Sequence, residues 1–318
     1  MEQMELAQLT AGMTFLGFLM VRSAEQRVNA KGGRYLDMNL IDKTGEVNCK
    51  MWDGTVAPPA RGTGVKIQAQ VQDFNGRVQL KIDRIRQALP ADDVDMTMLI
   101  PTAPEAPESM REQIDRTLAS FTSESLRKIV QAMLDMAGDS LSYYPAAKRM
   151  HHAERSGLLH HTTDMLKMAE RVLEVYPFLN ADLLRAGVII HDLGKIREMN
   201  SDEYGNVPEY SRDGVLVGHL VRGVALVEEA AKRANVTGEW VELLQHMVIS
   251  HHGIPEYGSP IRPSIPEAIA LHMIDTFDAT MFETKAVMDR TPEGAFSEAI
   301  SYMDGRRIYH PLYNDEAK

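Results

Sequence analysis

An adjacent histidine and aspartate, His191-Asp192, end a helix-like apolar stretch and are followed by Leu193-Gly194-Lys195. Two neighbouring side chains that can both bind metal are uncommon in a buried helix, because the fold must hide both polar groups. A buried charge is tolerated when it is paired or when it coordinates a cation. The pair therefore predicts a helical domain that is built around a polar, cation-binding centre.

Further histidines and one aspartate stand at helical intervals on the apolar faces of other predicted helices. His219, for example, follows Leu216 by three residues, and the helix that carries Asp275 is expected to open at Pro266. The inward-facing candidates are His161, His191, Asp192, His219, His251, His252 and Asp275. One inward histidine is most simply a hydrogen-bonded core residue, but five helices that each turn such a group inward favour metal coordination.

The types of ligand narrow the choice of metal ion. Imidazole and carboxylate groups without sulfur favour Mn, Co or Fe, with Zn or Ni as alternatives. The single cysteine, Cys49, excludes a thiolate-rich zinc site and an intrachain disulfide. Six or seven ligands exceed one closed tetrahedral site, so we predict two divalent ions with Asp192 as the bridge. Two ions roughly 3.5–4 Å apart can activate water and stabilise both oxygens in phosphoester hydrolysis.

The first part of the chain has the period-two pattern of strands. Val65, Ile67, Ala69 and Val71 alternate with polar residues, and Asn75-Gly76 is typical of a hairpin turn. Further strands are predicted at 14–22, 35–42 and 46–52. Five short strands favour an all-β oligonucleotide/oligosaccharide-binding (OB) barrel, although an SH3-like barrel would give a similar pattern.

The chain of 318 residues is long for one core and divides into parts of different character. Residues 89–109 contain four prolines and no clear period, which is typical of a linker or an extended strap. From about Ser109 onward the apolar spacing is helical. We therefore predict an OB-like nucleic-acid-binding barrel at 1–88, a linker at 89–109 and an all-α domain at 110–318.

The formal net charge of −11 conceals an asymmetry. Residues 11–90 hold twelve Lys/Arg against seven Asp/Glu, whereas the rest of the chain holds 22 against 38. Chance variation in surface charge can produce such a difference, but a basic binding module attached to an acidic domain also fits. Tyr35, Lys50 and Trp52, with Arg34 and Phe74, would supply the stacking and charge that single strands need. Packing within the barrel is the alternative role of these aromatic residues.

The order of the seven metal candidates resembles that of the HD-domain metal-dependent phosphohydrolases, and HDLGK at 191–195 is the most specific local match. The resemblance implies that Asp192 is catalytic through the metals and that a metal-activated hydroxide attacks phosphorus. It also implies that Lys195 contacts the phosphate, although a helix dipole would favour a cation there anyway. Arg155, Arg222 and Arg262 are further candidate substrate-binding residues.

A wider resemblance covers most of the chain. The OB-like module, the linker and the segments at 158–166, 218–220, 250–263, 271–279 and 305–311 are similar to the YhaM-type 3′-5′ exoribonucleases. This resemblance implies a hydrolase that shortens single-stranded RNA from the 3′ end, while the sequence leaves open whether DNA is also a substrate. The alternatives are an HD-type phosphohydrolase acting on free nucleotides and a non-catalytic nucleic-acid-binding adaptor. His160 departs from the family pattern, which has a carboxylate there, and we expect it to be exposed rather than an extra ligand.

Two further expectations concern location and partners. The sequence has no apolar run of membrane-spanning length, and its start lacks the order of a secretory signal. With one cysteine, the cytoplasm is the simplest location, and we expect no membrane partner. The sequence leaves the oligomeric state open, a homo-oligomer included. His151 and His152 are expected on the approach to the first ligand helix, where they would contact substrate or be solvated.

Overall fold

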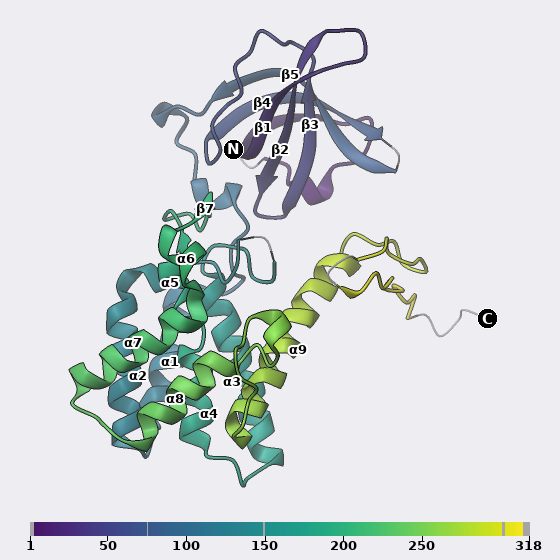
Figure 1. The fold of residues 1–318 in the computed structure, drawn as a ribbon. Helices are drawn as coiled ribbons and strands as arrows, with labels where there is room; N and C mark the ends of the chain where they lie inside the picture. Colours follow the sequence, from purple (N-terminus) through teal and green to yellow (C-terminus); the bar gives the residue numbers. More distant parts are fainter. Residues whose placement is uncertain (1–2, 75, 149, 301–302, 314–318) are drawn as a thin grey trace. The chain divides into compact units, whose positions relative to one another are not determined.

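The computed structural model describes residues 3–74, 76–148, 150–300 and 303–313. Its contacts divide the chain into two compact units (Figure 1). The barrel unit comprises Met1–Pro104 together with Ser201–Pro208, and the helical unit comprises Glu105–Asn200 and Glu209–Lys318. The finer division drawn from the sequence, at residues 88 and 109, stays a prediction.

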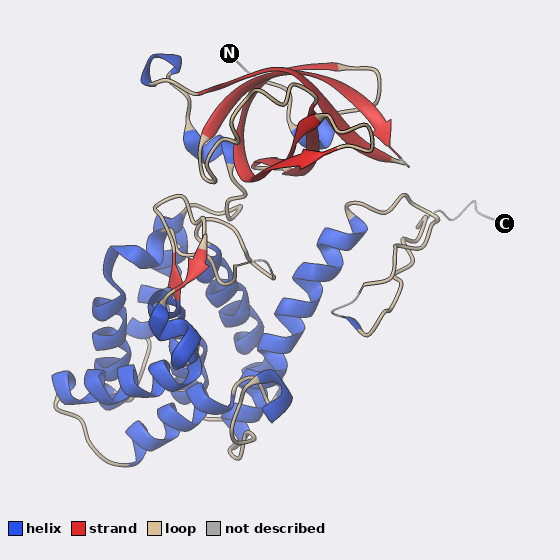
Figure 2. Cartoon of the chain, turned by 45° about the horizontal axis from the view of Figure 1, so that its top comes forward, coloured by secondary structure: helices blue, strands red, loops and turns tan. Residues whose placement is uncertain are grey.

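Five strands close the barrel unit, as predicted (Figure 2). They are β1 (Thr14–Val28), β2 (Arg34–Asp42), β3 (Gly45–Met51), β4 (Gly64–Phe74) and β5 (Arg77–Gln87). Their order around the barrel is β1-β2-β3-β5-β4, in which β3 and β5 pair in parallel and the other neighbours pair antiparallel. This is the OB-like barrel expected from the sequence. Asn75, in the predicted β4–β5 turn, lies outside the described residues.

The barrel core follows the alternation seen in the sequence. Val65, Ile67, Ala69 and Val71 are buried, whereas the glutamines between them are exposed. Cys49 is also buried in this core. Each fully buried aliphatic side chain contributes roughly 1.5–3 kcal/mol. The inward-facing set, rather than any single turn, therefore stabilises the barrel.

The chain that follows β5 stays with the barrel. Two 3₁₀ turns, η2 (Pro90–Asp92) and η3 (Met96–Leu99), bring Leu99 and Ile100 against Met20 and Ile41. The segment at 201–208 joins the same cluster through Tyr204. The Arg61 guanidinium donates to the side chain of Asn206 (3.2 Å) and to the carbonyl of Val207 (3.0 Å). A short piece from the second half of the chain is therefore part of the barrel unit.

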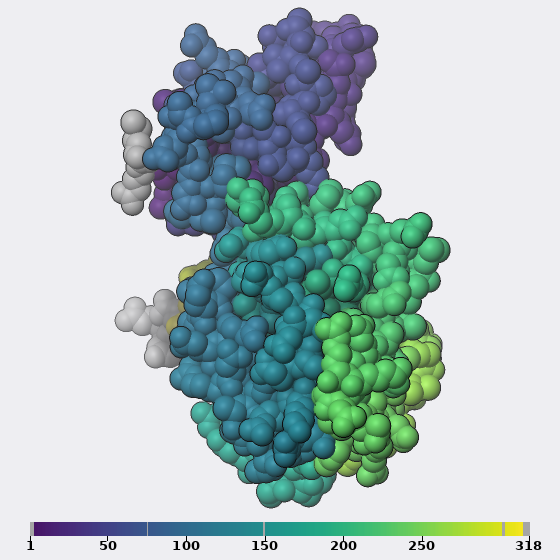
Figure 3. Space-filling model, turned by 90° about the vertical axis from the view of Figure 1, so that its left-hand side faces the viewer, coloured from purple at the N-terminus to yellow at the C-terminus, as the bar shows by residue number. Residues whose placement is uncertain are grey.

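Helices are the main regular structure of the helical unit. They are α1 (Pro107–Ala119), α2 (Glu124–Ala137), α3 (Gly157–Val175), α4 (Ala181–Ile190), α5 (Lys195–Glu198), α6 (Arg212–Leu216), α7 (Gly218–Ala234), α8 (Glu239–Ser250) and α9 (Pro266–Met288). A two-stranded pair, β6 (Met199–Asn200) with β7 (Glu209–Tyr210), interrupts them. On the face drawn in Figure 3, α2 and α7 lie side by side, and α8 packs against α7. The all-α expectation for this part is confirmed.

Local sequence signals explain several helix boundaries. Ser123 and Asn180 cap α2 and α4 through their side chains, and Pro266 opens α9 as predicted. One expectation was wrong: Leu216 and His219 do not share a helix, because Gly218 adopts a φ of +75° and separates α6 from α7. Leu216 is consequently exposed.

None of the helices in the described part of the chain is long and apolar enough to cross a membrane.

Candidate metal centre

The helical unit brings the seven predicted metal ligands into one cluster. They come from α3 (His161), the turn after α4 (His191 and Asp192), the start of α7 (His219), the end of α8 (His251 and His252) and the middle of α9 (Asp275). Every contribution comes from a helix or from the turn that ends one. The helices therefore fix the positions of the ligands relative to one another.

Asp192 lies at the middle of this cluster. Its Oδ2 atom is 3.4 Å from His191 Nε2 and 3.9 Å from His161 Nε2. Its Oδ1 atom is 3.6 Å from both His219 Nε2 and His251 Nε2. One carboxylate thus faces four imidazoles, two with each oxygen, which is the arrangement expected of a bridging ligand.

Two further residues shape the cluster: Asp275, which contacts His161, and Gly194, which lets two segments approach closely. Asp275 Oδ1 lies 3.2 Å from His161 Nε2. At Gly194, a Cβ atom would stand 2.4 Å from the carbonyl oxygen of His219. Only a residue without a side chain lets the turn after Asp192 approach α7 so closely, and the approach positions His219 beside the carboxylate.

The five histidines turn their Nε2 atoms toward the cluster, because their Nδ1 atoms are held by other groups. Their Nδ1 atoms are held by Asp278 Oδ2 (His161, 2.7 Å), Val188 O (His191, 2.9 Å), Glu198 Oε1 (His219, 2.9 Å), Val248 O (His251, 2.7 Å) and Tyr257 O (His252, 2.7 Å). A carbonyl oxygen only accepts hydrogen bonds, so the Nδ1 atoms that face carbonyls carry the proton. The Nε2 atoms are then free to donate a lone pair to a metal.

Three polar atoms inside the cluster lack hydrogen bonds. Among the buried side chains that the structure describes, Asp192 Oδ1, His219 Nε2 and His251 Nε2 have no partner; Ser259 Oγ is the remaining case. Leaving such a group unsatisfied costs roughly 1–3 kcal/mol. Asp192 Oδ1 lies 3.6 Å from each of the other two atoms. The residues present therefore fit a divalent cation that contacts all three.

The charges of the cluster suit a cation as well. Burial alone would raise the pKa of Asp192, but the Lys195 ammonium and the neighbouring histidines hold it well below its usual range. The Lys195 Nζ atom lies 2.6 Å from Asp192 Oδ2 and is itself buried at the start of α5. Burial lowers the pKa of His251 to about 3, which keeps this imidazole in its neutral, ligating form.

The predicted substrate-binding arginines come from three different segments of the helical unit. The Arg222 guanidinium forms a two-pronged ion pair with Asp213. Arg155 is half-buried just before α3, and Arg262 is exposed after the 3₁₀ turn η5 (Pro255–Tyr257). Their roles as phosphate contacts stay predictions.

On the barrel unit, the predicted aromatic and basic residues do lie together. The Tyr35 and Trp52 rings are 5.0 Å apart between centroids. Lys50 Nζ stands 5.6 Å from the ring centroids of both Tyr35 and Phe74. Trp52 is 51% exposed and Phe74 is 55% exposed, so these rings form a surface patch rather than barrel core. We call Tyr35, Lys50, Trp52 and Phe74 the stacking patch.

The sequence did not identify every residue that shapes the metal cluster. Glu198, which holds His219, was missed because nothing in the local pattern points from α5 to α7. Asp278 stands one turn beyond Asp275, a spacing that suits either a partner of a metal ligand or a satisfied core residue; in the structure its carboxylate contacts His161 Nδ1. His152 is buried, which excludes the solvated role expected for it and leaves substrate contact as a prediction. The exposed position expected for His160 was wrong, because His160 is largely covered between Glu154 and Asp164.

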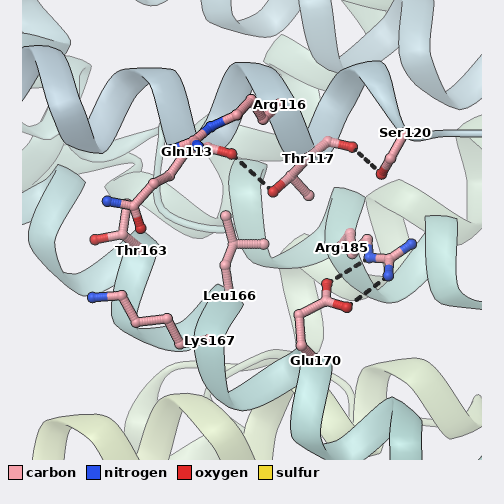
Figure 4. A pocket seen from close by; sticks show the side chains of 9 residues that line it. All are labelled: Gln113, Arg116, Thr117, Ser120, Thr163, Leu166, Lys167, Glu170 and Arg185. Carbon is pink, nitrogen blue, oxygen red and sulfur yellow. Dashed lines mark hydrogen bonds and ion pairs between the residues drawn. The ribbon is translucent and has the colours of Figure 1, made fainter.

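A separate cavity of about 400 Å³ opens between α1, α3 and α4 (Figure 4). The ion pair between Arg185 and Glu170, with both N···O distances at 2.7 Å, lines one side of it. None of the predicted ligands or substrate contacts is among its lining residues.

The comparisons with known proteins agree with this architecture. Residues 158–280, which include all seven predicted ligands, match the HD domain family model. The chain is thus an HD-domain protein in which an OB-like barrel precedes the HD domain in the sequence. It is 36% identical over 312 residues to the 3′-5′ exoribonuclease YhaM of Listeria monocytogenes serotype 4b (strain CLIP80459), covering 97% of this chain and 98% of that relative. The chain belongs to the YhaM family.

A second relative supports the same family. The 3′-5′ exoribonuclease YhaM of Geobacillus sp. (strain WCH70) is 35% identical over 302 residues, which cover 93% of this chain and 92% of that relative. Among solved structures, the second OB-fold domain of replication protein A from Methanococcus maripaludis matches 27% of this chain and 94% of that chain, with 15% identity and a TM-score of 0.24.

Proposed function

We propose that this protein is a divalent-metal-dependent 3′-5′ exoribonuclease that hydrolyses phosphodiesters of single-stranded RNA. The observation that carries the proposal is the convergence of three buried, unpartnered atoms, Asp192 Oδ1, His219 Nε2 and His251 Nε2. The printed names of the relatives supply the substrate and the direction, since they are called 3′-5′ exoribonucleases.

The seven ligands would hold two ions, with Mn, Co or Fe preferred and Zn or Ni as alternatives. When bound, such ions activate a water molecule and neutralise charge on the phosphate. The chain contributes the positions: hydrogen bonds at Nδ1 fix the rings, and Asp192 offers one oxygen to each side of the cluster. No side chain is then required to act as the nucleophile.

Lys195 would contact the scissile phosphate. Its ammonium is buried beside Asp192, and the Asp192 charge outweighs burial and raises the pKa of Lys195. The side chain is therefore a fixed positive charge next to the metal ligands. On the barrel unit, the stacking patch would hold unpaired bases by their faces, which suits a strand of any sequence.

Replacement of Asp192 by alanine tests the catalytic assignment. We expect the variant to lose the metal held by the seven-ligand cluster, together with hydrolysis of 5′-labelled single-stranded RNA, with circular dichroism confirming that the helices remain. Metal content is measured by mass spectrometry and hydrolysis on a denaturing gel. A folded Asp192→Ala protein that turns over RNA at the wild-type rate would exclude this mechanism. RNA left intact by the wild type while free nucleotides lose phosphate would favour the nucleotide phosphohydrolase instead.

A further inference from the structure

A second group of metal-ligating side chains lies at the start of α3, outside the seven-ligand cluster. His160 Nδ1 lies 2.7 Å from Glu154 Oε1 and 3.2 Å from His152 Nδ1, and His152 Nδ1 lies 3.6 Å from Glu154 Oε1. These three atoms face one another at separations short enough to share a single ion. The side chains are only 1% (His152), 12% (Glu154) and 14% (His160) exposed.

The far side of each ring in this group is held by a carboxylate. His152 Nε2 lies 2.8 Å from Asp278 Oδ2, and His160 Nε2 lies 3.2 Å from Asp164 Oδ2. A carboxylate behind a histidine fixes the tautomer and raises the basicity of the opposite nitrogen, which is the usual support of a metal-bound imidazole. Each ring therefore turns its Nδ1 atom toward Glu154, while a carboxylate at Nε2 raises the basicity of that Nδ1 atom.

The local fold prepares this geometry in advance. His152 adopts a left-handed backbone conformation (φ 51°), and its carbonyl accepts a hydrogen bond from the Ala146 amide (3.1 Å). A Cβ atom at Gly157 would meet that carbonyl at 2.0 Å, so only glycine lets the loop fold back onto the first turn of α3. The ring of Phe282 covers His152, with 4.0 Å between centroids.

We propose that His152, Glu154 and His160 form a second divalent metal site, distinct from the centre around Asp192. Two imidazoles and one carboxylate are a donor set for Zn²⁺, Fe²⁺, Co²⁺ or Mn²⁺ and leave coordination positions for water or a ligand. Metal binding at these three residues can be measured whether or not the protein hydrolyses RNA. Asp278 links the two centres, because its Oδ2 atom contacts both His152 and His161.

The rival state needs no ion. In it, a protonated His160 is held between Glu154 and Asp164 by charge-assisted hydrogen bonds. The two states differ in one measurable quantity, the number of metal equivalents that the full-length protein binds.

The test is a titration of metal-stripped full-length protein with Co²⁺, followed by mass spectrometry for content and visible absorption for coordination. We expect Glu154→Gln and His160→Gln each to lose one equivalent of Co²⁺ relative to wild type. Asp164→Asn removes the support of His160, along with an exposed ion pair to Lys167, and should weaken that equivalent about 10- to 100-fold. The control Glu174→Gln, the same chemical change at an exposed position of α3, should bind as wild type does.

Two results would overturn the proposal. One is a wild-type number of Co²⁺ equivalents, bound with wild-type affinity, in folded Glu154→Gln and His160→Gln proteins. The other result comes from the Asp192→Asn protein, in which His152, Glu154 and His160 are unchanged. In that protein we expect one Co²⁺ ion to remain bound, with the visible spectrum of a histidine-ligated ion. Absence of any bound Co²⁺ in that protein would show that the loop and α3 hold no ion of their own.

Discussion

At the scale of single residues, function depends on which nitrogen each histidine presents. The orientation of the Nε2 atoms that face the cluster is set by groups at the opposite ring nitrogen, such as the carbonyls of Val188 and Val248 and the carboxylate of Glu198. The helices themselves place the backbone carbonyls of Val188 and Val248. Glu198 is different, because a side chain can be changed without altering the fold.

We therefore expect Glu198→Gln to reduce metal affinity or activity about 10- to 100-fold while the protein stays folded. The amide cannot accept from His219 Nδ1 with the strength of a charged carboxylate, so the ring loses its fixed tautomer. Metal titration and RNA hydrolysis measure the effect. Glu229→Gln, an exposed change in an i,i+4 pair on α7, is the matched control. Equal behaviour of the two variants would refute the positioning role of Glu198.

At the scale of elements, the stacking patch is built from residues of β2, β3 and β4 and the residue after β3. Tyr35 belongs to β2 and Lys50 to β3, whose residues pair directly, and Trp52 follows β3 at its end. Phe74 ends β4 and reaches the same lysine. The closed barrel thus brings one ring from each of several segments to a common surface.

Trp52→Ala should weaken the binding of single-stranded RNA by roughly 1–3 kcal/mol, the contribution of one stacked base. Equilibrium binding in the presence of chelator separates this effect from hydrolysis. Leu16→Ala, which also removes an exposed apolar side chain from the barrel, should leave the affinity unchanged. If both variants bind RNA as the wild type does, the patch serves packing and not recognition.

The elements also show what can be predicted from the sequence. Alternation at 65–71 predicts β4 because its two faces have different environments, and the helical spacing of histidines predicts the metal cluster. The strand beyond Arg22 was missed, since Glu25, Gln26 and Arg27 are polar on both faces and form a strand through pairing with β2, which no local pattern reveals. His160 was assigned to the surface because its partner Glu154 comes from a loop, whose course no periodicity reveals.

At the scale of the whole molecule, the chain has two units with separate cores. Cys49 is buried in the barrel core, and burial raises the pKa of its thiol well above the usual range. The thiolate, which is the reactive form, is therefore absent from the folded barrel. Because this is the single cysteine of the chain, its labelling reports on the barrel alone.

Proteins with more than one core often depart from two-state unfolding. We expect the urea midpoint for labelling of Cys49 by a thiol reagent to differ from the midpoint for loss of helical circular dichroism. Pulse labelling across a urea series measures the first, and far-ultraviolet spectra of the same samples measure the second. Coincident midpoints would mean that the barrel and the helices unfold as one cooperative structure.

We propose that RNA hydrolysis from the 3′ end depends on a cation held by the atoms around Asp192 that have no hydrogen-bond partner. The most direct measurement compares metal-stripped protein with and without added Mn²⁺ on 5′-labelled single-stranded RNA. We predict no cleavage without metal and, with Mn²⁺, a ladder of 5′-labelled products that shortens from the 3′ end. Intact RNA in the presence of Mn²⁺, Co²⁺ and Fe²⁺, or equal cleavage after complete removal of metal, would contradict the account.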